Sequence, residues 1–451
     1  MSYIAKKGIV ILLMFFSIAL QAQSVHETPC NDTLVPYRVI DIHEYSYKEL
    51  MDEGINTLAR QLDVLHIPVK KFQFIIKDHI KRHPFSLNKG KHRLKNVTFR
   101  AISFAYASSS PEGEPVMLSG LVTIPVIEGN KPAKMLIQHR ILAPSYTIAP
   151  SNSLPFEAVL TADNTICVFP DYYGCGITEG KNLPYVSLNY HGRCATECAL
   201  AALQIVQDAG IELADDFYTW NTGYSQGGGY ALAVHKYIET SLPDSLARRI
   251  NLKWSLCGGG VYSPSEFYKT SIMTNNLGTT PAVFLESLRG LFFVHKDYFE
   301  NLTPRDFLSD KAIALGLDSL LLTYDDGLWD LVDRMGETGL GNDPTNYFCP
   351  AMLDTTSNHF INLMTVFDLD DCSRGWHPHS PIVFYHSKKD NCVPYQQAID
   401  AHRNLTDSGG KCTLVNSKSS GSHVFTSVFY YAKILRMSEE KLYKKYFLSK
   451  N

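Results

Sequence analysis

The chain has 451 residues, of which 45% are hydrophobic and 19% are charged, and its formal net charge is −3. This is the composition of a globular protein large enough for one big domain with insertions or for two domains. A net charge near zero, without a run of lysines and arginines interleaved with aromatic residues, argues against a nucleic-acid partner.

The first residues have the features of a secretory signal. Two lysines precede an apolar stretch from residue 8 to about residue 20, and small residues follow up to Ala22. A charged start, a short apolar core and a small-residue end are the parts of a cleavable signal peptide. We therefore predict a signal peptide over residues 1–22, cleaved after Ala22, and a secreted or periplasmic protein. The alternative is an uncleaved N-terminal anchor. No later segment has 18 uninterrupted apolar residues, so we expect no stable membrane span.

Residues 23–95 have the pattern of a helical extension. Apolar residues recur at helical spacing in YKELMDEGINTLARQLDVL and in VKKFQFIIKDHIKRH. From Asn96 the period changes, and VTFRAISFAYASSSPEGEPVMLSGLVTIPV has the pattern of two strands around a Ser/Pro/Gly turn. We expect this hairpin to open the main domain.

Apolar strand-like runs then alternate with helical stretches. The runs are KMLIQHRIL, NTICVFPDYYG, DFYTWNTGYS, INLKWSLCGGG, PIVFYHSKKD and KCTLVNSKSS. The helical stretches are GRCATECALAALQIVQDAG, GYALAVHKYIET, YQQAIDAHRNL and the C-terminal FTSVFYYAKILRMSEEKLYKKYF. Strands that are apolar throughout and alternate with helices are typical of a parallel sheet covered on both faces. The predicted fold class is therefore α/β.

Residues 263–379 interrupt this alternation. They contain no clear strand-like run, and helix-like pieces such as PAVFLESLRGLFFVHKDYF dominate. Segments this long between two parts of a sheet are uncommon without a function. We predict an inserted, mostly helical cap that divides the sheet domain into residues 96–262 and 380–451.

Ser225 is the first candidate for chemistry. It is the centre of a G-x-S-x-G pentapeptide, in which the glycines allow a strand to turn sharply into a helix and leave the serine exposed at the turn. The pentapeptide alone arises by chance in chains of this length. Its place between a predicted strand and a predicted helix favours a nucleophile over a serine in an ordinary turn.

Asp390 and His423 complete the set that a reactive serine needs. A serine hydroxyl requires a base to take its proton, and the base requires an acid to hold it. Both residues follow the carboxyl ends of predicted strands, where open parallel sheets place their sites, and they occur in the order serine, acid, histidine. The alternative acids are Asp370 and Asp371. The alternative base is His386, which precedes the acid and so falls out of order.

Two backbone N–H groups are needed to hold the developing oxyanion. The first candidate is Gln226, the residue after the serine. The second is Arg140 or Ile141, in the loop that follows KMLIQ. The alternative is that Arg140 and its neighbour His139 are ordinary surface-loop residues.

Ten cysteines fit an exported protein. Cys194 and Cys198 are predicted to share one face of a helix, and His191 is the only further metal ligand nearby. This favours two small buried hydrophobic residues over a metal site. The sequence leaves open two disulfides, Cys349 with Cys372 and Cys392 with Cys412.

Taken together, these segments resemble the α/β-hydrolase superfamily, and within it the secretory lipases and related bacterial esterases typified by the capped lipase A of Candida yeasts. The segments that carry the resemblance are YASSSPEGEPVMLSGLVTIP, QHRILAPS, FPDYYGCG, GYSQGG, WHPHSPIVFYHSKKDNCVPY and GSHVF. They extend from about Asn96 to the C-terminus, except over the cap. The resemblance implies hydrolysis of carboxylic esters through an acyl-enzyme, with Ser225, Asp390 and His423 as a triad and with no metal or cofactor. The expected partner is a small-molecule or lipid ester substrate.

Two residues depart from the family pattern. Arg140 and Ser387 each stand where the family usually has glycine. A side chain at position 140 is expected to narrow the acyl site or to place a positive charge beside it.

Other functions are open to the same residues. A peptidase or amidase of the prolyl-oligopeptidase type uses the same triad, although no propeller-like repeats precede the predicted catalytic domain. A non-catalytic binding protein with this fold is the other alternative, although such proteins typically lose a triad member. The glycine-rich stretches around Gly227 and Gly258 lack the Gly-Lys-Ser/Thr ending of a phosphate-binding loop. The sequence leaves the oligomeric state open.

Overall fold

The structure is a computed structural model that describes residues 35–64, 97–140, 153–278, 281–299, 302–322, 328–417, 422–437 and 439–448. The predicted signal peptide and the predicted helix in VKKFQFIIKDHIKRH lie outside these residues.

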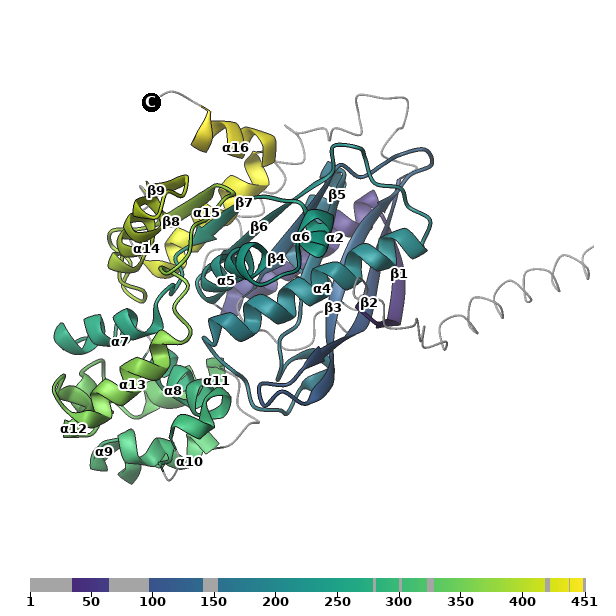
Figure 1. Cartoon of the computed structure of the whole chain (residues 1–451). Coiled ribbons are helices and arrows are strands. Elements are labelled where there is room, and N and C mark those ends of the chain that lie inside the picture. The colour runs from purple at the N-terminus through teal and green to yellow at the C-terminus, as the bar shows by residue number, and fades with distance from the viewer. Residues whose placement is uncertain are drawn as a thin grey trace, which may run out of the picture.

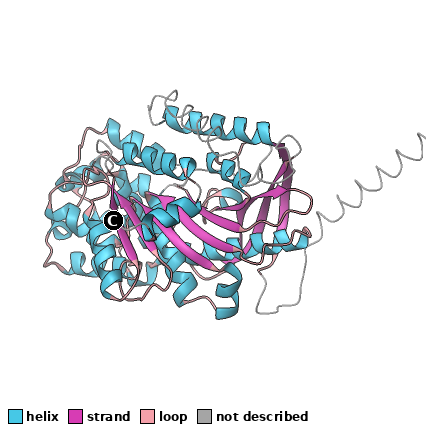
Figure 2. Ribbon diagram, turned by 90° about the horizontal axis from the view of Figure 1, so that it is seen from above, coloured by secondary structure: helices cyan, strands magenta, loops and turns pink. Residues whose placement is uncertain are grey.

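A nine-stranded sheet forms the centre of the described part of the chain (Figures 1 and 2). The strand order is β1-β2-β3-β5-β4-β6-β7-β8-β9. The first three pairs of neighbours are antiparallel and the remaining five are parallel. The mostly parallel sheet predicted from the sequence is therefore confirmed. The strands are β1 (Tyr37–Ser46), β2 (Thr98–Ser109), β3 (Pro115–Val126), β4 (Lys134–His139), β5 (Thr165–Pro170), β6 (Tyr218–Tyr224), β7 (Leu252–Gly258), β8 (Ile382–His386) and β9 (Cys412–Asn416).

Helices cover both faces of the sheet, as Figure 2 shows. Successive side chains of a strand point to opposite faces, and β5 illustrates this. Ile166 and Val168 belong to the apolar cluster that includes α4, whereas Cys167 and Phe169 belong to the cluster that includes α2 and α15. The helices of the sheet domain are α2 (Tyr47–Val64), α4 (Leu188–Asp208), α5 (Gln226–Thr240), α6 (Asp244–Ile250), α14 (Gln396–Asp407), α15 (His423–Arg436) and α16 (Glu439–Phe447).

The helical extension expected over residues 23–95 is wrong over Tyr37–Ser46. The segment Tyr37–Ser46 forms β1, which pairs with β2 from Tyr37 opposite Tyr106 to Ser46 opposite Thr98. The segment contains Tyr, Val and Ile residues that favour a strand, and the free backbone groups along the edge of β2 provide its partner. The helix predicted after it is present as α2.

The C-terminal helical stretch also differs from its prediction. It is divided into α15 and α16, and α15 ends where Met437 takes an extended conformation. The division allows α16 to turn back towards the sheet. There Glu439 accepts hydrogen bonds from the side chains of Tyr218 in β6 and Trp254 in β7.

The described residues between β7 and β8 form a separate group of helices, seen together at the lower left of Figure 1. This agrees with the helical insertion expected there. The α-helices are α7 (Pro264–Met273), α8 (Ala282–Val294), α9 (Asp310–Ala314), α10 (Leu317–Leu322), α11 (Leu328–Glu337), α12 (Pro350–Leu353) and α13 (Asn358–Asp368). One apolar cluster joins this cap to α5, because Phe284 and Leu288 of α8 share it with Tyr230.

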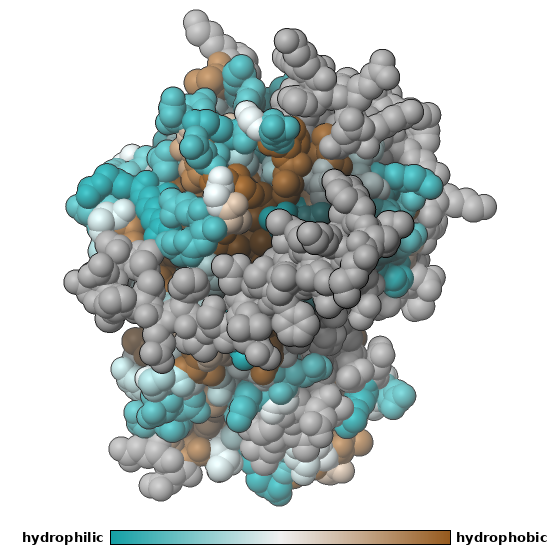
Figure 3. Space-filling model, turned by 90° about the vertical axis from the view of Figure 1, so that its right-hand side faces the viewer, coloured by the Kyte–Doolittle hydropathy of each residue, from teal (hydrophilic) through white to brown (hydrophobic). Residues whose placement is uncertain are grey.

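Two further features concern the surface of the molecule. None of the described helices is both long and apolar enough to cross a membrane. On the face shown in Figure 3, apolar surface lies in a hollow between hydrophilic regions.

Candidate active site

Ser225 occupies a strained turn between β6 and α5. Its φ of 59° and ψ of −124° are unfavourable for any residue with a side chain. Its backbone N–H donates to the carbonyl of Gly258 in β7, 2.8 Å away. The glycines of the pentapeptide permit this turn, because a Cβ on Gly223 would lie 2.2 Å from the carbonyl oxygen of Gly227, and one on Gly227 would lie 2.4 Å from that of His139. The turn is therefore packed directly against the end of β4.

The side chains of Ser225, His423 and Asp390 form one hydrogen-bonded chain. Oγ of Ser225 lies 2.8 Å from Nε2 of His423, and Nδ1 of His423 lies 2.7 Å from Oδ2 of Asp390. An Nδ1–H that donates to the carboxylate leaves Nε2 free to accept the serine proton. The imidazole is fixed through the backbone of His423, whose N–H donates to Asn391 and whose carbonyl accepts the hydroxyl of Tyr224.

The carboxylate of Asp390 is buried and held by four groups. Oδ1 accepts the backbone N–H groups of Cys392 and Val393 at 2.9 and 2.8 Å. Oδ2 accepts Nδ1–H of His423 and also lies 3.3 Å from Nε2 of His386. Burial acts to raise the pKa of Asp390, but the two histidines and their hydrogen bonds outweigh it and hold that pKa well below its usual range. The group therefore stays ionised near neutral pH.

The other acids considered from the sequence lie elsewhere. Asp370 accepts the hydroxyl of Ser187 and the backbone N–H of Asn189, so it ties the end of the cap to the start of α4. Asp371 accepts the hydroxyl of Ser263, at the start of the cap. Asp370 therefore holds the cap on the sheet domain, whereas Asp371 joins the two ends of the cap. The competing histidine, His386, lies beside the carboxylate of Asp390, on β8.

Gln226 and Arg140, two of the candidates for the oxyanion N–H groups, lie next to the turn that carries Ser225. Gln226 is the first residue of α5, and its side chain donates to the hydroxyl of Tyr230 at 2.6 Å. Arg140 directly follows β4, and its backbone nitrogen would lie 3.3 Å from a Cβ on Gly227. Its Nε lies 4.0 Å from the buried carboxylate of Glu157, in the 3-10 helix η3 (Phe156–Asp163). Ile141, the other oxyanion candidate, lies outside the described residues.

A small apolar pocket of about 20 Å³ opens beside Ser225. The sheet domain, the cap helix α8 and the strap (residues 184–187, immediately before α4) all contribute to its wall. The lining residues are Tyr185, Val186, Leu188, Ser225, Gln226, Tyr230, Val261, Val283, Cys392 and Val393. The sequence analysis did not identify the strap, since no local motif marks it and only folding brings it to the serine.

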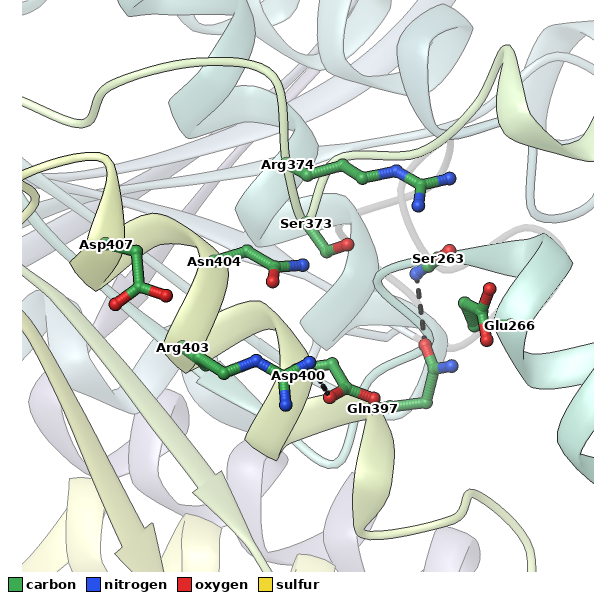
Figure 4. Close-up of a pocket in the computed structure, with 9 residues that line it drawn as sticks. All are labelled: Ser263, Glu266, Ser373, Arg374, Gln397, Asp400, Arg403, Asn404 and Asp407. Carbon is green, nitrogen blue, oxygen red and sulfur yellow. Dashed lines mark hydrogen bonds and ion pairs between the residues drawn. The ribbon is translucent and has the colours of Figure 1, made fainter.

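A larger hollow of about 500 Å³ lies between α7 and α14 and is polar (Figure 4). Its lining is Ser263, Glu266, Ser373, Arg374, Gln397, Asp400, Arg403, Asn404 and Asp407. None of these residues belongs to the hydrogen-bonded chain. Its arginines are paired with acids, Arg403 with Asp400 at 2.6 Å and Arg374 with Asp371 at 2.8 Å. The apolar pocket is therefore the better candidate for the carbon chain of a substrate.

Most of the described cysteines are buried. Cys194 and Cys198 are fully buried in the cluster around α4, which confirms that they pack as small hydrophobic residues. Among the described residues, no three His, Cys, Asp or Glu side chains are grouped so that they could hold a metal ion. Neither of the two disulfides left open by the sequence is formed, because Cys349, Cys372 and Cys412 have free thiols.

Comparison with known proteins identifies the fold. No family model matches the sequence, and no curated protein matches it significantly. Solved structures do match. The rice cell wall degrading esterase LipA from Xanthomonas oryzae has a TM-score of 0.67 at 18% identity, and the match covers 92% of this chain and 98% of LipA. A putative hydrolase from Legionella pneumophila has a TM-score of 0.66 at 16% identity, covering 93% and 100%. For Candida antarctica lipase A in its closed state, the TM-score is 0.52 at 17% identity, covering 74% and 75%. The chain therefore has the α/β-hydrolase fold, in the form found in LipA, in the Legionella protein and in Candida antarctica lipase A.

Proposed function

We propose that the protein is a secreted serine hydrolase that cleaves carboxylic esters through an acyl-enzyme. The observation that carries the proposal is the hydrogen-bonded chain from Asp390 through His423 to Ser225, next to an apolar pocket. The similar structures include an esterase and a lipase, which supports an ester as the substrate. The alternatives, a peptidase and a non-catalytic binding protein, gain no support from these comparisons.

In the first half of the proposed reaction, Oγ of Ser225 attacks the ester carbonyl carbon while Nε2 of His423 takes the Oγ proton. Asp390 holds the imidazole in the tautomer that can accept this proton and stabilises the imidazolium that forms. The oxyanion of the tetrahedral intermediate accepts the backbone N–H of Gln226 and an N–H of the 140–141 loop. His423 then gives its proton to the alcohol oxygen, the carbon–oxygen bond breaks, and the alcohol leaves an acylated Ser225.

In the second half, water repeats the attack. His423 takes a proton from the water as its oxygen attacks the acyl carbon, and the same N–H groups hold the second oxyanion. When this intermediate collapses, the bond to Oγ breaks, the carboxylic acid leaves, and the proton on His423 returns to Ser225. The chain's own residues perform every proton transfer, so this route uses neither a metal nor a cofactor.

The test is hydrolysis of p-nitrophenyl esters by the wild type and by Ser225→Ala. We expect the substitution to lower kcat by at least about 10⁴-fold, because the nucleophile is lost while the fold is kept. The matched control is Ser241→Ala, an exposed serine at the other end of α5, which should keep wild-type activity. Equal activity of the wild type and Ser225→Ala would refute the assignment of the nucleophile.

The proposed secretion rests on residues 1–22. A full-length chain expressed in a bacterium with a periplasm should yield a mature protein that begins at Gln23 and lies outside the cytoplasm. Intact-mass measurement of the purified protein gives the answer. A protein that retains residue 1 and stays in the cytoplasm would exclude the signal peptide.

A further inference from the structure

The pocket beside Ser225 is very small for an ester-cleaving enzyme. Its free volume is about 20 Å³, and a single water molecule needs about 10–15 Å³ on the same measure. Pockets that enclose whole drug-sized ligands have volumes of about 300–1,000 Å³. The space that the described residues leave next to Ser225 therefore suits a group of one or two carbon atoms.

The pocket lies on the side of Ser225 where the acyl group would sit. The leaving alcohol must be next to Nε2 of His423, which protonates it, and His423 does not line the pocket. Gln226, whose N–H is the proposed oxyanion donor, does line it. The apolar walls thus lie beside the carbonyl end of the substrate, away from the leaving group.

One wall of the pocket has an unusual backbone. Val186, in the strap, has a φ of 61°. The other described non-glycine residues with positive φ are three asparagines and Ser225 itself. A β-branched residue is strongly disfavoured in this conformation, so surrounding contacts must hold it there. Strain of this kind is typical of active sites and ligand clamps.

Two elements hold the strap on either side. In α8, a Cβ on Gly290 would lie 2.5 Å from the backbone nitrogen of Tyr185, so the cap helix packs directly on the strap. In α5, the fully buried Tyr230 shares the apolar cluster and the pocket wall with Val186. The next residue, Ser187, donates to Asp370 at 3.1 Å. Because these neighbours are themselves buried, the wall cannot easily move away from a longer chain.

From this geometry we propose that the enzyme acts on esters of short acyl groups, acetyl or propionyl, and that Val186 sets the limit on acyl length. The inference rests on the proposed ester hydrolysis by Ser225. The side chain of Val186 is held against the acyl end of the substrate by a strained backbone that Tyr230 and α8 fix. Longer acyl chains meet this wall before the carbonyl carbon reaches Ser225.

Val186→Gly tests the proposal while it keeps the local backbone conformation. Glycine accepts a φ of 61° without strain, so the variant keeps the backbone and removes only the side chain that fills the pocket. The matched control is Asn164→Gly, which also introduces glycine at a positive φ, 54°, but at the amino end of β5, whereas Ser225 lies beyond the carboxyl end of β6. Val283→Ala widens the pocket independently, from α8.

The measurement is kcat/KM for p-nitrophenyl acetate, butyrate and octanoate. We expect the wild type to prefer acetate over octanoate by about 100-fold or more, and Val186→Gly to narrow this ratio at least tenfold by raising the rate with octanoate. Val283→Ala should act in the same direction, and Asn164→Gly should keep the wild-type ratio.

Two outcomes would contradict the short-acyl proposal and leave the proposed ester hydrolysis intact. One is Ser225-dependent hydrolysis that is equally fast with acetate and octanoate. The other is a ratio of kcat/KM for acetate to that for octanoate that stays at the wild-type value in both Val186→Gly and Val283→Ala. If these variants instead change the preference among acetates of different alcohols, the pocket holds the alcohol and the proposal is wrong. Absence of hydrolysis with every ester, or hydrolysis that survives Ser225→Ala, would remove the proposed function and this inference with it.

Discussion

Asp390 shows how one carboxylate can serve two histidines. Its Oδ1 is occupied by two backbone N–H groups, so both imidazoles approach the remaining oxygen, His423 at 2.7 Å and His386 at 3.3 Å. His386 also approaches the carbonyl of Val393 at 3.0 Å, which fixes its ring. The shorter contact belongs to His423, the histidine that reaches Ser225. His386 acts from the other side, where it helps to keep the carboxylate in place.

The role of Asp390 can be tested by Asp390→Asn. The amide would donate to Nδ1 of His423 instead of accepting from it, and Nε2 would then carry the proton and could not take one from Ser225. We expect kcat for p-nitrophenyl acetate to fall by about 10⁴-fold with little change in KM.

A carboxylate on the surface provides the control for this variant. Asp400→Asn removes a charge that is paired with Arg403 on the exposed side of α14, and it should leave kcat unchanged. If Asp390→Asn kept a tenth or more of the wild-type kcat, the carboxylate would not be the group that orients His423.

At the level of elements, the sequence placed three candidate side chains at strand ends, and the structure brings these three together. The buried strands were visible as apolar runs, and β4, β6, β7, β8 and β9 are parallel. Their carboxyl ends therefore lie along one edge of the sheet. Ser225 directly follows β6, Asp390 follows β8 and His423 follows β9, so a list of strand ends was enough to group the three side chains.

The elements that the sequence did not predict depend on distant contacts. The Tyr, Val and Ile residues of Tyr37–Ser46 favour a strand, but the sequence does not show that the edge of β2 is where β1 pairs. The strap is packed against α8 and Tyr230, which lie far from it in the chain. The direction of the Arg140 side chain depends on Glu157 in η3. Local patterns predict elements, but they do not report which distant element will pack against a given loop.

At the scale of the whole molecule, a line of hydrogen-bonded polar side chains joins the strands beneath the turn that carries Ser225. Nε2 of His139 lies 2.8 Å from Oδ1 of Asn221, whose amide donates to Ser255 at 3.1 Å. Ser255 in turn lies 2.8 Å from Nδ1 of His235 in α5. The line joins β4, β6, β7 and α5 inside the apolar core. Buried hydrogen-bonded groups of this kind favour one packing of the elements, because any other arrangement leaves them without partners.

Two histidines of this buried region make the stability of the fold depend on pH. Burial lowers the pKa of His139 to about 3 and that of His191 to about 4, although hydrogen bonds to Asn221 and to the carbonyl of Ser187 act in the opposite direction. An unfolded histidine titrates near 6.5. Below that pH the unfolded chain binds protons that the folded chain does not, so the free energy of unfolding falls as the pH falls. The loss continues until the pH approaches 3 to 4.

The variant His139→Gln/His191→Phe should remove much of this dependence. Glutamine can still accept from Tyr172 and donate to Asn221, and phenylalanine keeps the ring stacked on Tyr230 at 4.1 Å, but neither residue titrates. Each histidine contributes about 1.4 kcal/mol per pH unit, so between pH 5.5 and 4.5 the wild type should lose about 2–3 kcal/mol more than the variant. Urea unfolding at these two pH values measures the difference. The exposed His379→Gln serves as the control and should keep the wild-type slope. A double variant that lost as much stability as the wild type would show that the two imidazoles do not stay neutral in the folded protein.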